Sequence, residues 1–195
     1  SMSFKDALKL AQELGYAERD PSADVEGHDA CRKICILASL AFGKHVYPDN
    51  IHTEGITNIS LEDVAYANRW GGVIKLIGDV KNTGNGMLDI FVAPMLISEE
   101  SQLSGIDDVF NGILVRGDAT GDVVFYGKGA GKLPTASAVV ADIVDCIKHI
   151  NARKYLFWSD CDGSNVLPYD ESISAMYVRA NGSIKTAQSV FNKIT

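Results

Sequence analysis

A cluster of acidic residues followed by one lysine lies between positions 18 and 33 and could bind a cationic group and move a proton. The carboxylates are Glu18, Asp20, Asp24, Glu26 and Asp29, and the lysine is Lys33. Asp29 and Lys33 are four residues apart, so on a helix they share a face and can form an ion pair. An ordinary ion pair at the start of a helix would also explain this spacing. A lysine among apolar helix positions, however, is costly unless it has a partner or a task.

A second candidate is the glycine-rich stretch YGKGAGKLPTASAVVADI, residues 126–143. It fits neither the dinucleotide fingerprint, because its third glycine comes one residue early, nor the P-loop, which needs four residues between its glycines. Gly127, Gly129 and Gly131 could serve a tight turn from a strand into a helix. They could instead allow close approach of the backbone to a ligand at the start of that helix.

Three stretches of the chain together resemble the homoserine dehydrogenase family. The pattern A-x3-G-Y followed by D-P-x2-D-V-x-G-x-D-x3-K runs from Ala11 to Lys33 without a gap. Residues 54–77 (EGITNISLEDVAYANRWGGVIKLI) and 112–143 (GILVRGDATGDVVFYGKGAGKLPTASAVVADI) follow in the family order. The likeness covers roughly residues 4–150 and implies the α+β fold of the family's catalytic domain.

The resemblance implies an oxidoreductase that interconverts L-homoserine and L-aspartate 4-semialdehyde in the biosynthesis of threonine, methionine and isoleucine. By motif position, Lys33 is the predicted proton donor and acceptor at the C4 oxygen, and Asp29 would position it and bind substrate. Glu18 would bind the substrate amino group, with Asp24 and Tyr16 in the same substrate-binding wall. A lysine suits this chemistry, because reduction of an aldehyde by hydride leaves an alkoxide that needs a proton.

The resemblance also implies that NAD or NADP is bound mainly by a nucleotide-binding domain that is not in this chain. Gly15, Gly129 and Gly131 are predicted to face the cofactor, and the family's monovalent-cation site is expected outside the chain. The fragment is therefore expected to be inactive alone. The alternative is a non-catalytic regulatory module that binds amino acids on the same fold.

Composition limits the partners and the surroundings of the protein. The 195 residues carry a net charge of -7, which argues against nucleic acid as a partner. No apolar run is long enough to span a membrane. The four cysteines contain no CxxC pair and indicate free thiols in a reducing cytoplasm. His28, Cys31 and Cys35 share a helix face, but buried thiols are the favoured interpretation and no metal site is predicted. A homodimer through the catalytic-domain sheet is expected from the resemblance.

Periodicity predicts an α+β fold in which helices cover one face of a mixed β-sheet. The predicted helices are residues 4–14, 30–43, 59–71 and 133–150, and the predicted strands are residues 72–80, 87–97, 109–118 and 122–127. The helix at 30–43 is apolar on every side after Lys33 and is expected to be buried all round. The expected domains are a catalytic domain at 3–155, a linker at 156–172 and the start of an ACT-like regulatory domain at 173–195. That last part would begin with a strand at 174–181 and a helix at 183–194.

Overall fold

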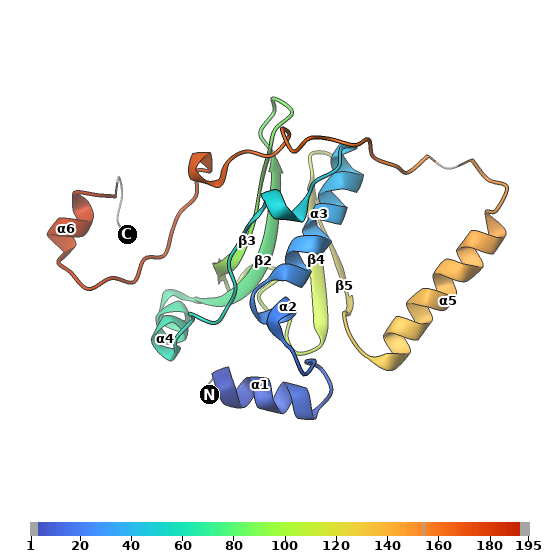
Figure 1. Ribbon diagram of the computed structural model, residues 1–195. Coiled ribbons are helices and arrows are strands. Elements are labelled where there is room, and N and C mark those ends of the chain that lie inside the picture. The colour runs from blue at the N-terminus through green and yellow to red at the C-terminus, as the bar shows by residue number, and fades with distance from the viewer. Residues whose placement is uncertain (1–3, 154, 192–195) are drawn as a thin grey trace.

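The computed structural model describes residues 4–153 and 155–191 (Figure 1). In chain order, the elements are α1 (Phe4–Glu13), α2 (Ser22–Val25), α3 (His28–Phe42), the 3-10 turn η1 (Pro48–Asn50), β1 (His52–Thr53), α4 (Leu61–Trp70), β2 (Gly72–Asn82), β3 (Leu88–Ser98), β4 (Phe110–Gly117), β5 (Gly121–Lys128), α5 (Lys132–Lys148), the 3-10 turn η2 (Tyr169–Glu171) and α6 (Ile184–Gln188). None of the described helices is long and apolar enough to cross a membrane.

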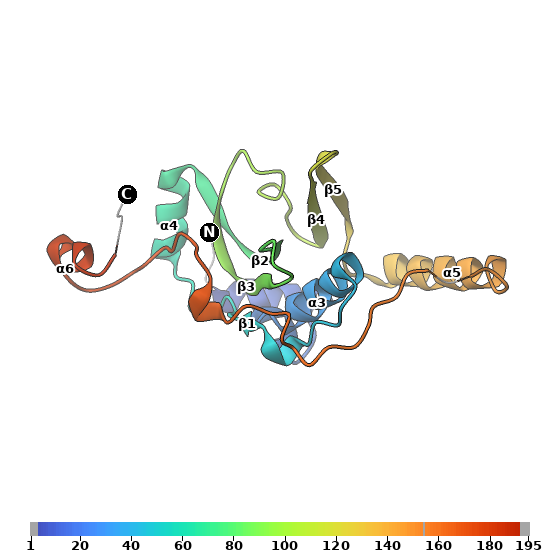
Figure 2. The same ribbon diagram turned by 90° about the horizontal axis from the view of Figure 1, so that it is seen from above.

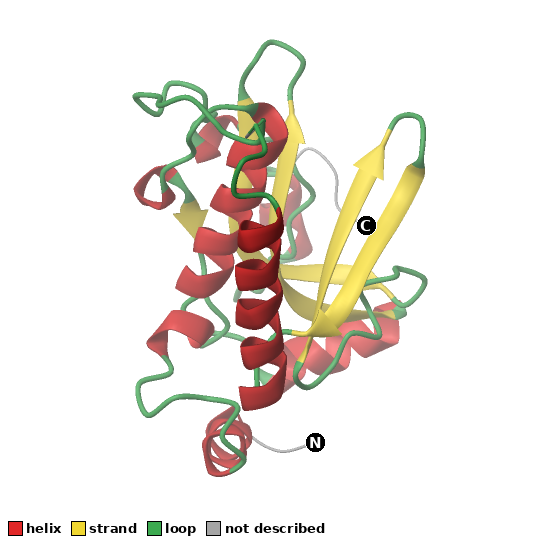
Figure 3. Cartoon of the chain, turned by 90° about the vertical axis from the view of Figure 1, so that its right-hand side faces the viewer, coloured by secondary structure: helices red, strands yellow, loops and turns green. Residues whose placement is uncertain are grey.

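The predicted α+β fold with a mixed sheet is confirmed, but the four long strands belong to two sheets. The first sheet has the order β1-β3-β2, with β1 parallel to β3 and β2 antiparallel to it. The second is the antiparallel hairpin of β4 and β5. Figure 3 shows the hairpin standing apart from β2 and β3. The long connection between β3 and β4 allows this separation, because it spans 99–109 and not a tight turn.

The core lies where α3 packs against β2 and β3. Its buried residues are Cys31, Cys35, Ala38, Val46, Ile51, Leu88, Ile90 and Val92. The approach of α3 is close, because a Cβ atom on Gly78 of β2 would lie 3.0 Å from the Cβ of Ile34. The expectation that this helix is buried all round is wrong. Ile36 is 52% exposed, so α3 buries one stripe and leaves the opposite side open.

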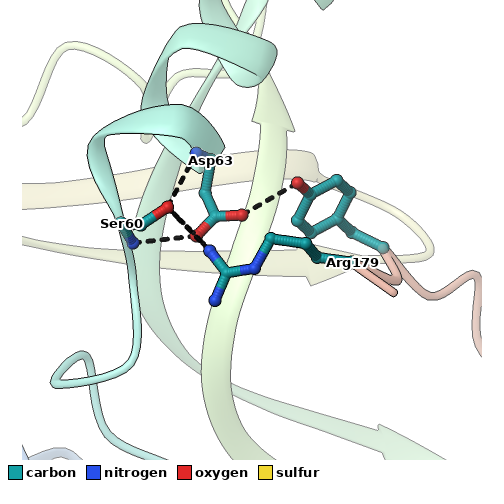
Figure 4. A network of polar contacts seen from close by, with 4 residues as sticks. Ser60, Asp63 and Arg179 are labelled. Carbon is teal, nitrogen blue, oxygen red and sulfur yellow. Dashed lines mark hydrogen bonds and ion pairs between the residues drawn. The ribbon is translucent and has the colours of Figure 1, made fainter. Parts of the chain in front are cut away.

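Helix α4 follows the N-cap residue Ser60, which forms a complete capping box with Asp63. The Asp63 carboxylate is buried and also accepts hydrogen bonds from the side chains of Tyr177 and Arg179 (Figure 4). Ser60 Oγ accepts a further bond from Arg179 at 2.6 Å. One buried carboxylate therefore joins the start of α4 to the C-terminal segment, 114 residues further along the chain.

The C-terminal part differs from its prediction. Residues 174–181 form no strand, because within the described chain no neighbouring strand offers them backbone partners. The helix that follows, α6, spans five residues, and 192–194 of its predicted range lie outside the described residues. The predicted linker contacts the folded body: Leu88 donates its backbone N–H to the carbonyl of Asn165 at 2.8 Å. The bounds of the two domains and of the linker stay predictions.

Candidate active site

An open pocket of about 250 Å³ lies between the α2–α3 segment and the β4–β5 hairpin. Its lining residues are Tyr16, Asp24, Asp29, Lys33, Asp108, Val109, Asn111, Gly129 and Ala130. Three carboxylates and one ammonium group therefore face the same space. This excess of negative charge favours a ligand that carries a positive group.

Local backbone geometry brings the two acidic residues of the N-terminal wall together. Gly27, between α2 and α3, has a φ of 80°, a left-handed conformation that glycine adopts without strain. The chain turns there, so that Asp24 on α2 and Asp29 in the first turn of α3 line the same pocket. A carboxylate in the first turn of a helix is also stabilised by the helix dipole.

The predicted ion pair of α3 is confirmed. Lys33 Nζ lies 2.7 Å from Asp29 Oδ2, and the two side chains are 54% and 44% exposed. Because water reaches both groups, the pair adds little to the stability of the fold. The same openness leaves the ammonium group accessible to a ligand in the pocket.

Lys33 has a second polar neighbour on the opposite wall. Its Nζ donates to Oδ1 of Asn111, on β4, over 3.5 Å. Sequence reasoning missed Asn111 because it lies 78 residues away, and no local spacing indicates the contact. It also missed Asp108, which stands just before β4 with a φ of 55°, an uncommon conformation for a residue with a side chain.

The structure places three other predicted site residues outside this pocket. Glu18 is exposed, and among the described contacts its backbone carbonyl accepts a hydrogen bond from the Gln12 side chain at 2.9 Å. Gly15 follows α1 in a left-handed conformation with open space around it. Gly131 is the N-cap of α5. Their binding roles stay predictions, as do those of the residues that line the pocket.

The four cysteines are free thiols, as predicted. Cys31 and Cys35 are buried in the core, which confirms the interpretation of this helix face as packing. Burial raises the pKa of Cys35 to about 12, so this thiol stays protonated and unreactive. In the part of the chain that the structure describes, no group of three or more His, Cys, Asp or Glu side chains could hold a metal ion.

Gly55 lies against the backbone of Val25, the last residue of α2, and we expect Gly55→Ala to destabilise the protein by about 1–3 kcal/mol, the usual cost of overpacking. A Cβ atom there would lie 2.2 Å from the carbonyl oxygen of Val25, which accepts a hydrogen bond from Ile56. Either α2, which carries Asp24, or the 54–56 backbone would have to move.

Urea unfolding measures this cost. The matched control is Gly105→Ala, because nothing lies within 4 Å of a Cβ atom at Gly105. Equal midpoints for the two variants would show that the contact at Gly55 relaxes without cost.

These features define an α+β domain whose open, acidic pocket presents an ion-paired lysine, an arrangement suited to proton transfer on a substrate that carries a cationic group. The family model of homoserine dehydrogenase matches residues 1–144. The chain belongs to the homoserine dehydrogenase family, a family of oxidoreductases.

Individual relatives agree with this assignment. The chain is 47% identical to a homoserine dehydrogenase of Helicobacter pylori over 99% of its own length and 45% of the relative. It is 42% identical to one of Neisseria gonorrhoeae, over 91% of the chain and 42% of the relative. The solved homoserine dehydrogenase of Thiobacillus denitrificans superposes with a TM-score of 0.78 at 42% identity, over 86% of this chain and 40% of that one. The chain thus spans less than half the length of these relatives.

Proposed function

We propose that this chain is the substrate-binding and proton-transferring part of a homoserine dehydrogenase, which interconverts L-homoserine and L-aspartate 4-semialdehyde with NAD or NADP. The single observation that carries the proposal is the open Lys33–Asp29 ion pair in an acidic pocket. The family supports the reaction class. The biosynthetic pathways that use this reaction would lead to threonine, methionine and isoleucine.

The charges of the pocket suit the two ends of this substrate. Its α-ammonium group would lie near Asp24 and Asp108, since three carboxylates outnumber one lysine there. Glu18 is proposed as a further partner of the ammonium group, from the loop that also carries Tyr16. When the aldehyde is reduced, Lys33 would donate a proton from Nζ to the C4 alkoxide oxygen. In the oxidation of homoserine it would take that proton back, while Asp29 keeps Nζ at the pocket.

Small residues suit one wall of the pocket to a flat ring. Gly129 and Ala130 line it with nothing larger than a methyl group. The nicotinamide would exchange the hydride with C4 when bound. We propose Gly15, Gly129 and Gly131 as cofactor contacts, while the rest of NAD or NADP and the family's monovalent cation would be held by parts of the enzyme outside this chain. A hyperthermophilic archaeal homoserine dehydrogenase, solved in complex with NADPH, superposes with a TM-score of 0.62 at 28% identity and supports this cofactor class.

The apolar surface of α5 supports packing against further protein. Figures 1 and 2 show this helix lying apart from both sheets. Six large apolar residues, on α5 or just after it, are between 53% and 82% exposed: Leu133, Val139, Val140, Ile143, Ile147 and Ile150. Such a continuous apolar surface is unfavourable in water and typical of an interface. We therefore propose that α5 packs against the remainder of the enzyme and that the 195-residue chain is inactive without it. Within this chain, we propose a catalytic domain at 3–155 and the start of a regulatory domain at 173–195.

The assay that tests the function is oxidation of L-homoserine by the full-length enzyme with NADP and with NAD. Activity with at least one cofactor, and none in the isolated chain, is the expected result. A full-length protein that is inactive with both cofactors would contradict the proposal and favour the regulatory module.

We also propose that the enzyme is cytoplasmic, which its four free thiols support, because free thiols are typical of a reducing compartment.

We also propose that the enzyme is a homodimer that buries one face of the β4–β5 hairpin. Ile113 pairs with Phe125 and Val115 with Val123, and all four side chains are 40% to 61% exposed on that face. Phe125→Asp would place a charge in the interface and is expected to convert the dimer to a monomer in light scattering. Thr120→Asp, at the turn of the same hairpin, should leave the dimer intact. A dimer in both variants would place the interface elsewhere.

A further inference from the structure

We propose that Asn111 is a positioning residue that holds Lys33 over the pocket, and that residue 129 is glycine because the Asn111 side chain lies against it. Neither residue of this contact pair belongs to the acidic cluster around Lys33. The consequence for catalysis rests on the proposed function, since it uses the proton transfer assigned to Lys33. The contact itself rests on geometry alone.

Lys33 needs more than Asp29 to hold its ammonium group in one place. The Asp29 carboxylate lies on the same helix, one turn earlier, and binds Nζ at 2.7 Å. A lysine side chain has four flexible carbon–carbon bonds, and this one is half exposed, so a partner on its own helix leaves several positions of Nζ open. The side-chain amide oxygen Oδ1 of Asn111 lies on the opposite wall and accepts from Nζ at 3.5 Å. Because the two acceptors lie on opposite walls of the pocket, together they hold Nζ of Lys33 at a position between them.

The position of Asn111 depends in turn on Gly129. A Cβ atom at position 129 would lie 2.3 Å from Cγ and Nδ2 of Asn111 and 2.5 Å from its Oδ1. The backbone cannot yield easily, because the N–H of Gly129 donates to the carbonyl of Val109 at 2.9 Å. Any side chain at 129 would therefore displace the Asn111 amide from the position in which it accepts from Lys33.

An amide is chemically suited to this task. Its oxygen accepts a hydrogen bond from the lysine ammonium group but does not take the proton at neutral pH. Asp29 already supplies the negative charge beside Lys33. Asn111 therefore adds direction without competing for the proton that Lys33 is proposed to transfer.

The test compares two substitutions at Asn111 in the full-length enzyme. Asn111→Leu keeps the approximate shape and removes the acceptor, whereas Asn111→Asp keeps an acceptor oxygen at the same place. We expect Leu to lower kcat for homoserine oxidation about tenfold, less than the roughly hundredfold cost of a 1 Å misplacement because Asp29 still holds Lys33, with little change in KM for homoserine. Asp should recover part of kcat, because its oxygen still accepts from Nζ, although its charge holds the lysine proton more tightly than an amide does. Equal kcat values for Leu and the wild type, or equal losses in Leu and Asp, would overturn the positioning role.

A double-mutant cycle tests the part played by Gly129. Gly129→Ala should lower kcat as Asn111→Leu does, because it displaces the amide. In an Asn111→Ala background, where Cγ, Nδ2 and Oδ1 are absent, Gly129→Ala should cost little more. Non-additive losses of this kind indicate that two residues act through one contact. A cofactor contact alone would raise KM for the cofactor equally in both backgrounds, and an equal loss of kcat in both backgrounds would overturn the link between Gly129 and Asn111.

Crystal structures keep the two proposals separable. An inactive wild-type enzyme would remove the proposed function but would not decide the contact. In the wild type, Nζ of Lys33 should be ordered between Asp29 and Asn111, and in Asn111→Leu it should leave that position. An unchanged lysine in the variant would overturn the inference even if the enzyme were active.

Discussion

Lys33→Met is expected to lower kcat for homoserine oxidation by the full-length enzyme by roughly a hundredfold or more, the contribution of a positioned general acid–base group. Methionine is similar in length and apolar, so it fills the same space without a proton to exchange. The ion pair with Asp29 is open to water, so its loss should leave the unfolding midpoint nearly unchanged. Steady-state kinetics and thermal unfolding of the same samples separate the two effects.

The matched control is Lys9→Met. Lys9 also pairs with a carboxylate four residues along its helix, Glu13 at 3.9 Å, but it does not line the pocket. Its replacement should leave kcat unchanged. Lys33→Arg distinguishes charge from proton transfer, because arginine can keep the pair with Asp29 yet holds its proton at neutral pH. Activity close to wild type in Lys33→Arg or Lys33→Met would assign the proton transfer to another group.

Asp63→Ala is expected to destabilise the protein by about 2–4 kcal/mol, the range for loss of an N-cap contact together with hydrogen bonds to a charged group. The Asp63 side chain is 3% exposed and accepts from Ser60, Tyr177 and Arg179. Alanine would leave these donors without their acceptor and release the C-terminal segment from α4. Urea unfolding measures the loss. The control is Glu62→Ala, since Glu62 is acidic in the same first turn but exposed, and its effect should be much smaller.

The contribution of Asp63 should also depend on pH. The backbone N–H of Ser60 is the largest cause that holds the pKa of Asp63 below its ordinary value, and Tyr177 and Arg179 act in the same direction. Because the pKa is lower in the folded state, the stabilisation is present above the unfolded pKa of about 4 and is lost as pH falls through the folded pKa. The difference in stability between wild type and Asp63→Ala should therefore shrink in acid. A difference independent of pH would show that the carboxylate charge contributes nothing.

The sequence by itself determined the parts of this protein that depend on near neighbours. The pairing of Asp29 with Lys33 follows from a spacing of four residues on a helix. The cap of α4 at Ser60 follows from residue types within one turn. The long strands and α5 also follow from local periodicity and composition. In each case the interacting groups lie within a few residues of each other, so their spacing along the chain is enough to predict the contact.

Only the tertiary structure decided which distant segments meet. It brought Asn111 to Lys33 and Asp108 to the same pocket, separated the strands into two sheets and joined Arg179 to Asp63. It also left one side of α3 open, although the apolar pattern predicted burial all round. Such contacts depend on how whole elements pack and on where long connections lead the chain. The residue types and spacing within one segment therefore do not predict such a contact. Each contact stabilises the fold only when the elements on both sides of it are in place.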